Sequence, residues 1–313
     1  MWLAFAFLSA FLLGFYDVSK KYSLRDNAVI PILFLNTLFC SIIFLPLAFQ
    51  TPFGGWEVQR YIVLKAFIVL SSWLLGYIGI KHLPITIVGP INATRPVMVL
   101  VGALIIFGER LNPWQWAGVL VAILSFFLLS KSGQKEGIDF KHNRWILCIV
   151  GAAVLGAISG LYDKFLMTTE GGMGLPRLTV QCWYNFYQCL MMGVILLCYW
   201  KGLLPAKQRN LADNRHSLPL KGAGGLGAER GLFQWRWSIL LISVFLSVAD
   251  YVYFYSLSLD GALICIVSMV RRSSVLVSFM LGALLFHEKN LRSKAIDLAL
   301  VMLSMVLLWL GQE

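Results

Sequence analysis

Charged residues are scarce in this sequence. Only 13% of its 313 residues are Asp, Glu, Lys or Arg, whereas hydrophobic residues make up 59% and the mean hydropathy is +0.76. Soluble domains average about 25% charged and about 45–50% apolar residues, so this composition excludes a soluble protein and indicates a membrane protein. Acidic residues are the scarcer sign, and the formal net charge is +11. We attribute this excess to membrane topology and anionic lipid headgroups, and we expect no nucleic-acid partner.

Cysteine and histidine are also few, with six and four residues respectively. The cysteines all fall within apolar segments, at spacings that suit neither a disulfide framework nor a metal site. The histidines lie in loops or at the ends of apolar segments, without ligand spacing. The loops also lack the acid pair, His-Asp dyad or metal set that an integral membrane enzyme requires. The sequence therefore predicts no metal centre, no cofactor, no catalytic residues and no enzyme activity.

Long apolar runs dominate the chain. A membrane-spanning helix needs about 20 apolar residues, and we expect ten such helices. They lie at 2–19, 28–49, 61–80, 85–107, 113–130, 145–166, 178–200, 237–258, 261–286 and 295–311. The first has no basic segment before it and no small-residue cleavage site after it, so we expect it to be retained. We count the basic residues of the loops and include Lys65, after an even-numbered span, and Lys294, after an odd-numbered span. Most of the counted residues follow odd-numbered spans, which predicts that both termini face away from the cytoplasm.

The sequence repeats itself. Residues 104–111 read LIIFGERL and residues 284–291 read LLFHEKNL, and each motif joins two apolar runs. Earlier, the Gly-Phe-Tyr-Asp at 14–17 is echoed by the Gly-Leu-Tyr-Asp at 160–163. With five spans in each copy, an odd number, the second copy must enter the membrane in the opposite orientation. Such inverted repeats are typical of secondary transporters.

We therefore predict an all-α integral membrane fold of ten transmembrane helices, arranged as two inverted five-helix repeats. The first repeat covers residues 1–130 and the second covers residues 145–313. A basic connecting loop, 131–144, joins them, and a flexible basic loop lies at 201–236 within the second repeat. The two repeats would meet around a cavity near the middle of the bilayer.

The apolar fourth and ninth spans end in FGER and FHEK, and the fifth span reads WQWAGVLVAILSFFLL. This pattern resembles the drug/metabolite transporter superfamily, in particular its EamA branch. The resemblance implies a ten-helix carrier that moves small metabolites, amino acids or drug-like solutes. It also implies cytoplasmic termini, which the loop charges contradict, so the orientation stays open. Glu109 and Glu288 match the family glutamate, and we expect each to cap the helix that follows it.

Polar residues near the middle of the fourth span form the first candidate site. An ionisable residue at the bilayer centre costs about 2.5–3.5 kcal/mol, so Arg95 requires a partner, a wet cavity or a function. Asn92 and Arg95 lie three residues apart and share a helical face. Pro90 and Pro96 flank them and should kink or break the helix, freeing backbone groups. Two interpretations stay open, a solute-binding site and a structural kink in which Arg95 pairs with a carboxylate.

The ninth span carries a second candidate, Arg271 and Arg272. Neighbouring helix positions point about 100° apart, so we expect one arginine to face the cavity and the other to meet an acid. The nearest acid is Asp250 in the eighth span, which shares a face with Tyr253. A structural ion pair and a role in solute binding are equally compatible with Asp250.

The repeated Tyr-Asp pairs are the third candidate. Tyr16 and Asp17 lie late in the first span, and Tyr162 and Asp163 lie at the matching place in the sixth. Symmetric acids can exchange protons as a carrier turns between its two sides, so we consider a coupling or gating role. Salt bridges near the membrane interface are the alternative.

Taken together, the residues predict a secondary transporter of the cell membrane that works by alternating access. Its central cavity is expected to be positive and to accept a small anionic or zwitterionic metabolite. The alternatives are an integral membrane enzyme and a non-transporting, lipid-binding membrane protein. The expected partners are a small-molecule solute and membrane lipids, and a homodimer is left open.

Overall fold

The computed structural model describes residues 2–25, 27–95, 97–98, 112–134, 142–167, 172–201, 233–258, 270–286 and 291–311. All regular secondary structure in these ranges is helical. The helices are α1 (Trp2–Leu24), α2 (Val29–Ala48), α3 (Gly55–His82), α4 (Ile85–Ala93), α6 (Pro113–Gln134), α7 (Arg144–Met167), α8 (Arg177–Trp200), α9 (Trp237–Ser258), α11 (Ser274–Phe286) and α12 (Leu291–Leu310). The predicted glutamate caps, Glu109 and Glu288, and most of the predicted loop 201–236 lie outside the described residues.

The helices are suited to a bilayer. Four segments of the described chain are long and apolar enough to cross a membrane, namely Val29–Ala48, Gly55–His82, Arg144–Asp163 and Arg177–Trp200. Large apolar side chains are exposed on the outside of the bundle, among them Phe49, Trp56 and Trp237. In a soluble protein such a surface would drive aggregation, whereas lipid covers it favourably. The predicted all-helical membrane fold is supported, and the count of ten spans stays a prediction.

Several helices are longer than their hydropathy suggests. The first was expected to end at residue 19 but runs to Leu24, and the third was expected to begin at residue 61 but begins at Gly55. At the end of α1, the Lys21 ammonium donates to the backbone oxygen of Ile80 at 2.6 Å. A basic side chain thus satisfies a carbonyl at the end of α3, which the helix itself leaves unpaired. Hydropathy reads such a lysine as loop, whereas the structure uses it to hold two helix ends together.

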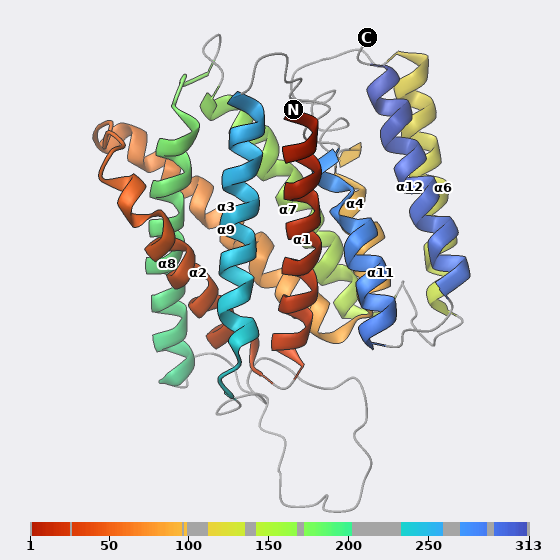
Figure 1. Ribbon diagram of the computed structural model, residues 1–313, viewed down its shortest axis with the longest axis horizontal. Helices are drawn as coiled ribbons and strands as arrows, with labels where there is room; N and C mark the ends of the chain where they lie inside the picture. Colours follow the sequence, from red (N-terminus) through yellow and green to blue (C-terminus); the bar gives the residue numbers. More distant parts are fainter. Residues whose placement is uncertain are drawn as a thin grey trace, which may run out of the picture.

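Helices of each half of the chain pack against helices of the other half, and they do so in matching pairs. In Figure 1, α1 runs through the middle of the bundle beside α9 and α11, and α3 packs against α7 and α8. If α7, α8 and α9 are the counterparts of α1, α2 and α3, the α1–α9 contact corresponds to α7–α3, and α2–α9 corresponds to α8–α3. All four of these helix contacts are present in the structure. Helix α1 begins at the same end of the bundle at which α12 finishes (Figure 1).

One helix from each half forms a pair at the edge of the bundle, where α6 and α12 lie side by side (Figure 1). Helix α6 starts with a capping box, because Asn112 Oδ1 accepts from the Gln115 N–H at 2.9 Å and Gln115 Oε1 accepts from the Asn112 N–H at 3.0 Å. The Asn112 amide also donates to the Gly311 oxygen at 2.6 Å. Further along, Ser125 Oγ donates to the backbone oxygen of Asp297 at 2.7 Å. Polar contacts therefore fasten this pair at two levels.

Glycine permits close contact between α4 and α11. A Cβ added to Gly282 would collide with the Ile85 side chain, whereas one added to Gly76 on α3 would lie 3.7 Å from Ala152 Cβ, an ordinary contact. Small residues at such crossings let helix backbones approach, and the resulting van der Waals packing contributes to helix association in lipid.

We expect Gly282→Ala to destabilise the protein by about 1–3 kcal/mol, the usual cost of overpacking. Gly76→Ala is the matched control, and it should be neutral or stabilising because alanine favours the helix. Thermal unfolding of the purified proteins in detergent measures both. Equal melting temperatures for the two variants would show that the α4–α11 contact is not tight.

Candidate functional site

The fourth helix is interrupted where the sequence predicts it. Helix α4 contains Pro90 and ends at Ala93. The Thr94 N–H donates to the Ile91 oxygen at 3.2 Å, and the Thr94 hydroxyl donates to the same oxygen at 2.7 Å. A residue ahead of proline disfavours helix, and Pro96 follows two positions later. Arg95 is therefore presented at a break in the helix.

A second break lies ahead of α11. The Ser273 N–H and hydroxyl both donate to the Val270 oxygen, at 3.0 and 2.6 Å, and α11 begins at Ser274. Thr94 and Ser273 are 273 − 94 = 179 residues apart, and the repeated glutamates are 288 − 109 = 179 residues apart. The two breaks thus occupy equivalent positions in the sequence repeat. Arg271 and Arg272 precede the second break directly, as Arg95 follows the first.

Arg271 forms an ion pair with an acidic residue. Its guanidinium forms an ion pair with Asp250 on α9 and lies over the Tyr253 ring, 4.3 Å from the centroid. Gln181 on α8 donates to the other Asp250 oxygen at 3.4 Å. Both groups of the ion pair are largely buried, with exposed fractions of 21% and 14% for Arg271 and Asp250. Of the two interpretations of Asp250, the ion pair is present.

Arg272 has a different environment from Arg271. Its side chain is exposed, and no acid among the described residues forms an ion pair with it. It interacts electrostatically with the guanidinium groups of Arg95 and Arg271. Three like charges in one neighbourhood repel one another, so an anion that entered between them would be stabilised.

Arg95 is held by a hydrogen bond and by a small neighbour. Its Nη2 donates to Asn92 Oδ1 at 3.2 Å, while its buried Nε has no partner among the described residues. A Cβ on Gly156 of α7 would lie 2.9 Å from Arg95 Cζ, so this glycine makes room for the guanidinium. Arg95 also interacts electrostatically with Tyr16 and Asp17. The structure therefore brings the first and third sequence candidates close to each other.

The two Tyr-Asp pairs have different partners. Asp17 pairs with Lys20 on its own helix at 2.9 Å, and the Lys20 ammonium lies 4.3 Å from the Tyr16 ring centroid. Asp163 on α7 instead pairs with Lys65 on α3 at 2.6 Å. Tyr162 lies next to this pair in sequence, and its hydroxyl donates to the Tyr61 backbone oxygen at 3.2 Å. The second ion pair joins the two halves of the chain, whereas the first lies within one helix.

Counting Lys65 and Lys294 as loop residues was wrong. Lys65 lies within α3, its side chain is 4% exposed, and it also donates to Ser159 Oγ at 2.5 Å. Lys294 lies within α12, fully buried, and donates to Thr86 Oγ1 at 2.9 Å. Partners on other helices allow both lysines to be buried, and sequence alone does not reveal those partners.

Tyr184 on α8 is a site residue that the sequence analysis missed. Lys65 lies 5.9 Å from its ring centroid, and Tyr184 interacts electrostatically with both Asp250 and Asp163. It thus lies near both ion pairs, Asp163 with Lys65 and Asp250 with Arg271. The available signal was the polar spacing of QCWYNFYQ at 181–188, where Gln181, Asn185 and Gln188 recur on one helical face.

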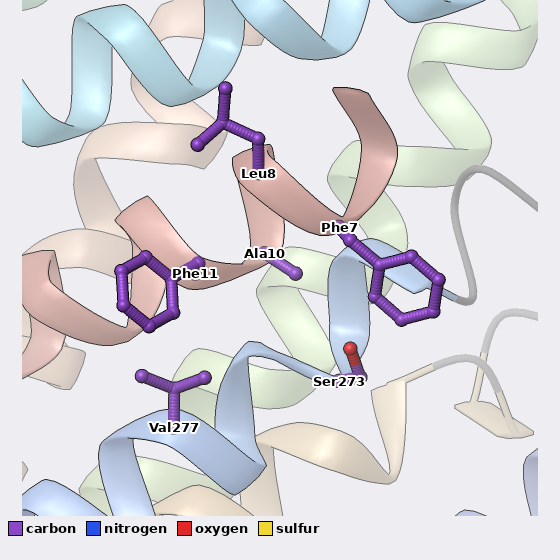
Figure 2. A pocket seen from close by; sticks show the side chains of 6 residues that line it. All are labelled: Phe7, Leu8, Ala10, Phe11, Ser273 and Val277. Carbon is purple, nitrogen blue, oxygen red and sulfur yellow. The ribbon is translucent and has the colours of Figure 1, made fainter. Parts of the chain in front are cut away.

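An apolar groove lies at the seam of α1 and α11. It has a volume of about 340 Å³ and is lined by Phe7, Leu8, Ala10, Phe11, Ser273 and Val277. Phe7 lies near Ser273 and Phe11 lies over Val277 (Figure 2). Beyond the groove the helices touch, because a Cβ on Gly14 would lie 2.5 Å from Val277 Cβ. The groove suits an apolar group and is chemically distinct from the arginine cluster.

Metal chemistry has no scaffold in the part of the chain that the structure describes, since no group of three His, Cys, Asp or Glu side chains there could hold an ion. Ion pairs and hydrogen bonds hold the charged groups that the structure describes near the site. The charge that these contacts do not neutralise is positive and lies at the two helix breaks.

Comparison with known proteins agrees with this architecture. Residues 1–131 match the model of the EamA-like transporter family. An uncharacterized transporter of Archaeoglobus fulgidus is 27% identical over 130 residues, which cover 39% of this chain and 45% of the relative. The chain thus spans less than half the length of the curated relative it matches. A solved structure titled "Crystal structure of protein" superposes on this chain with a TM-score of 0.61 and 12% sequence identity. The match includes 98% of this chain and 96% of the other chain, and it shows the fold alone.

The apolar helices and the family match define a multi-pass membrane protein. The resemblance to the drug/metabolite transporter superfamily, and to its EamA branch, is confirmed by the family match over the first 131 residues.

We expect Lys65→Met to lower the free energy of unfolding by about 1–3 kcal/mol. Removing one partner of a fully buried ion pair costs about 3–5 kcal/mol, and the 35% exposure of the Asp163 side chain reduces this value. Adding Asp163→Asn to the Lys65→Met variant should recover part of the loss, since it removes the uncompensated carboxylate. Unfolding of the four proteins of this cycle measures the coupling. Purely additive effects would show that the two side chains do not interact.

Proposed function

We propose that the protein is a secondary transporter that moves a small anionic or zwitterionic solute across the cell membrane by alternating access. The observation that carries the proposal is Arg272, which is exposed and lacks an acidic partner among the described residues. An uncompensated guanidinium within the bilayer is costly unless water or a ligand meets it. The acid group of a solute would neutralise it.

In this proposal the residues divide the work of binding. Arg272 and Arg95 receive the acid group, and Asn92 orients Arg95 through its hydrogen bond. Asp250 neutralises Arg271, so the cluster keeps an excess of positive charge without three free cations. Tyr253, against which Arg271 already packs, offers an aromatic wall to the solute.

Alternating access requires that two halves of the bundle rock about a central site. The equivalent helix breaks at Thr94 and Ser273, and the exchange of helix contacts between the halves, support two inverted repeats. The matched family and the curated relative both carry the name transporter, which we extend to this chain.

The Tyr-Asp pairs supply the gating and coupling groups of the proposal. Asp163 binds Lys65 across the two halves, so rocking must stretch or break this pair. Asp17 binds Lys20 within α1, so the same motion leaves that pair intact. Tyr162 lies next to Asp163 in sequence and would hydrogen-bond to the water that replaces the broken contact, whereas Tyr16 stays beside the intact Asp17–Lys20 pair.

We expect Arg272→Ala to weaken transport of anions about 10–100-fold, because one charge-assisted hydrogen bond is worth about 1.5–3 kcal/mol. Uptake of a panel of labelled carboxylates, phosphates, amino acids and lipophilic cations into proteoliposomes is the measurement. Arg60→Ala is the control, because Arg60 is exposed and, among the described residues, forms its ion pair with Glu57 on its own helix. The control should transport at the wild-type rate.

A wild-type preference for lipophilic cations would contradict the charge argument. Unchanged anion uptake by an Arg95→Ala and Arg272→Ala double variant would do the same. Chemical conversion of a lipid by the purified protein would instead favour an enzyme.

A further inference from the structure

Helix α8 carries a stripe of carboxamide side chains on its inward face. Gln181, Asn185 and Gln188 recur at intervals of four and three residues and therefore share one face of the helix. All three are buried, with exposed fractions of 7%, 3% and 0%. A polar stripe on a membrane helix that faces other helices rather than lipid needs a partner for each polar atom.

The stripe is only partly satisfied by the protein. Within the described residues, Asn185 Nδ2 and both amide atoms of Gln188 have no hydrogen-bond partner. The Nδ2 of Asn36 on α2, fully buried, has none either. Each unpaired buried polar group is destabilising, and native proteins hold few of them. Polar groups that are retained at a cost to stability are expected where they contact a ligand.

These amides lie around the place where α2 packs between α8 and α9. Ser41 on α2 donates to the Asn185 backbone oxygen at 3.0 Å, which fixes the α2–α8 contact. Ser243 on α9 donates to Asn36 Oδ1 at 3.0 Å, which fixes the α2–α9 contact. Helix α2 packs closely against both neighbours (Figure 1), whereas α8 and α9 are not a closely packed pair. The interval between α8 and α9 is therefore not closed by a direct contact between these two helices.

The stripe begins at the arginine cluster. Gln181, its first member, donates to the Asp250 carboxylate that pairs with Arg271. Tyr184, next to Asn185, interacts electrostatically with that same carboxylate. A continuous row of polar side chains thus leads from the candidate anion site into the bundle.

We propose that Asn36, Asn185 and Gln188 form a second subsite, which binds an uncharged hydrogen-bonding group, a hydroxyl or a carbonyl, of the solute whose acid group meets Arg272. The subsite rests on the proposed transport function and refines its substrate class. A primary amide both donates and accepts, so it recognises a hydroxyl or a carbonyl equally. An alkyl group placed there would leave the amides unpaired, and discrimination against it is strong. The preferred solute is therefore a hydroxylated or carbonyl-bearing anion rather than a simple alkyl carboxylate.

The test uses three probes of one carbon skeleton, propionate, lactate and glycerate, which carry no, one and two hydroxyls beside one carboxylate. Their binding to the purified full-length protein in detergent is measured by calorimetry, and their exchange by counterflow in proteoliposomes. Gln188→Met keeps the size of the side chain and removes its hydrogen bonds, and Asn185→Leu does the same one turn away. Leu190→Met is the control, on the outward face of the same helix with 53% exposure.

We expect wild-type protein and the Leu190→Met control to bind glycerate at least 10-fold more tightly than propionate. Gln188→Met and Asn185→Leu should reduce this ratio to about one while propionate affinity is unchanged. The ratio, rather than the absolute affinity, is the readout, because a purely structural role of the amides would alter all three affinities together. Melting temperatures at or above the wild-type value would show that the variants fold.

Three results would overturn the inference. Equal binding of the three probes by the wild type would remove the subsite while leaving the anion site intact. A glycerate preference that survives Gln188→Met and Asn185→Leu would show that the amides hold water alone. Failure of the wild type to bind any of the three anions, together with wild-type preference for cations in the uptake panel, would remove both the subsite and the proposed transport function.

Discussion

The bilayer interior lacks water to solvate charge, and this constraint organises the protein. Three described acids of the bundle each have a cation beside them, because an unpaired carboxylate there would be costly. The three pairs are Asp17 with Lys20, Asp163 with Lys65, and Asp250 with Arg271. Once these pairs are formed, the positive charge of Arg272 is left over. In the proposed function, this excess of positive charge is what favours an anionic solute.

The helix breaks explain why the surplus charge lies at one place. A continuous helix satisfies its own backbone, whereas a break at Thr94 or Ser273 leaves polar groups that side-chain hydroxyls then meet. Both hydroxyls bond to the carbonyl three residues back. An arginine next to such a break reaches the interior without a full turn of helix in front of it. Local backbone chemistry and the electrostatics of the cluster therefore share one cause.

Composition and periodicity were sufficient to predict an all-helical membrane protein, the interruption after α4, and an acid on α9 that pairs with one of the two adjacent arginines. They failed for Lys65 and Lys294, because hydropathy scores a lysine by its charge and cannot see the acceptor on another helix. The carboxamide stripe was missed for the same reason, since its meaning depends on α2 and α9. The number of spans and their orientation stay predictions. So do the roles of the site residues, which depend on the solute.

The pair formed by α6 and α12 has a mechanical consequence. One helix comes from each half, and the Asn112–Gly311 and Ser125–Asp297 hydrogen bonds fasten them at two separated levels. Two fastenings along a line resist sliding and splaying but permit rotation about that line. In the proposed rocking motion the line of contact between these helices would serve as the rotation axis. Displacements would then be smallest beside this seam and largest at the far side of the bundle, where α2 and α8 lie (Figure 1).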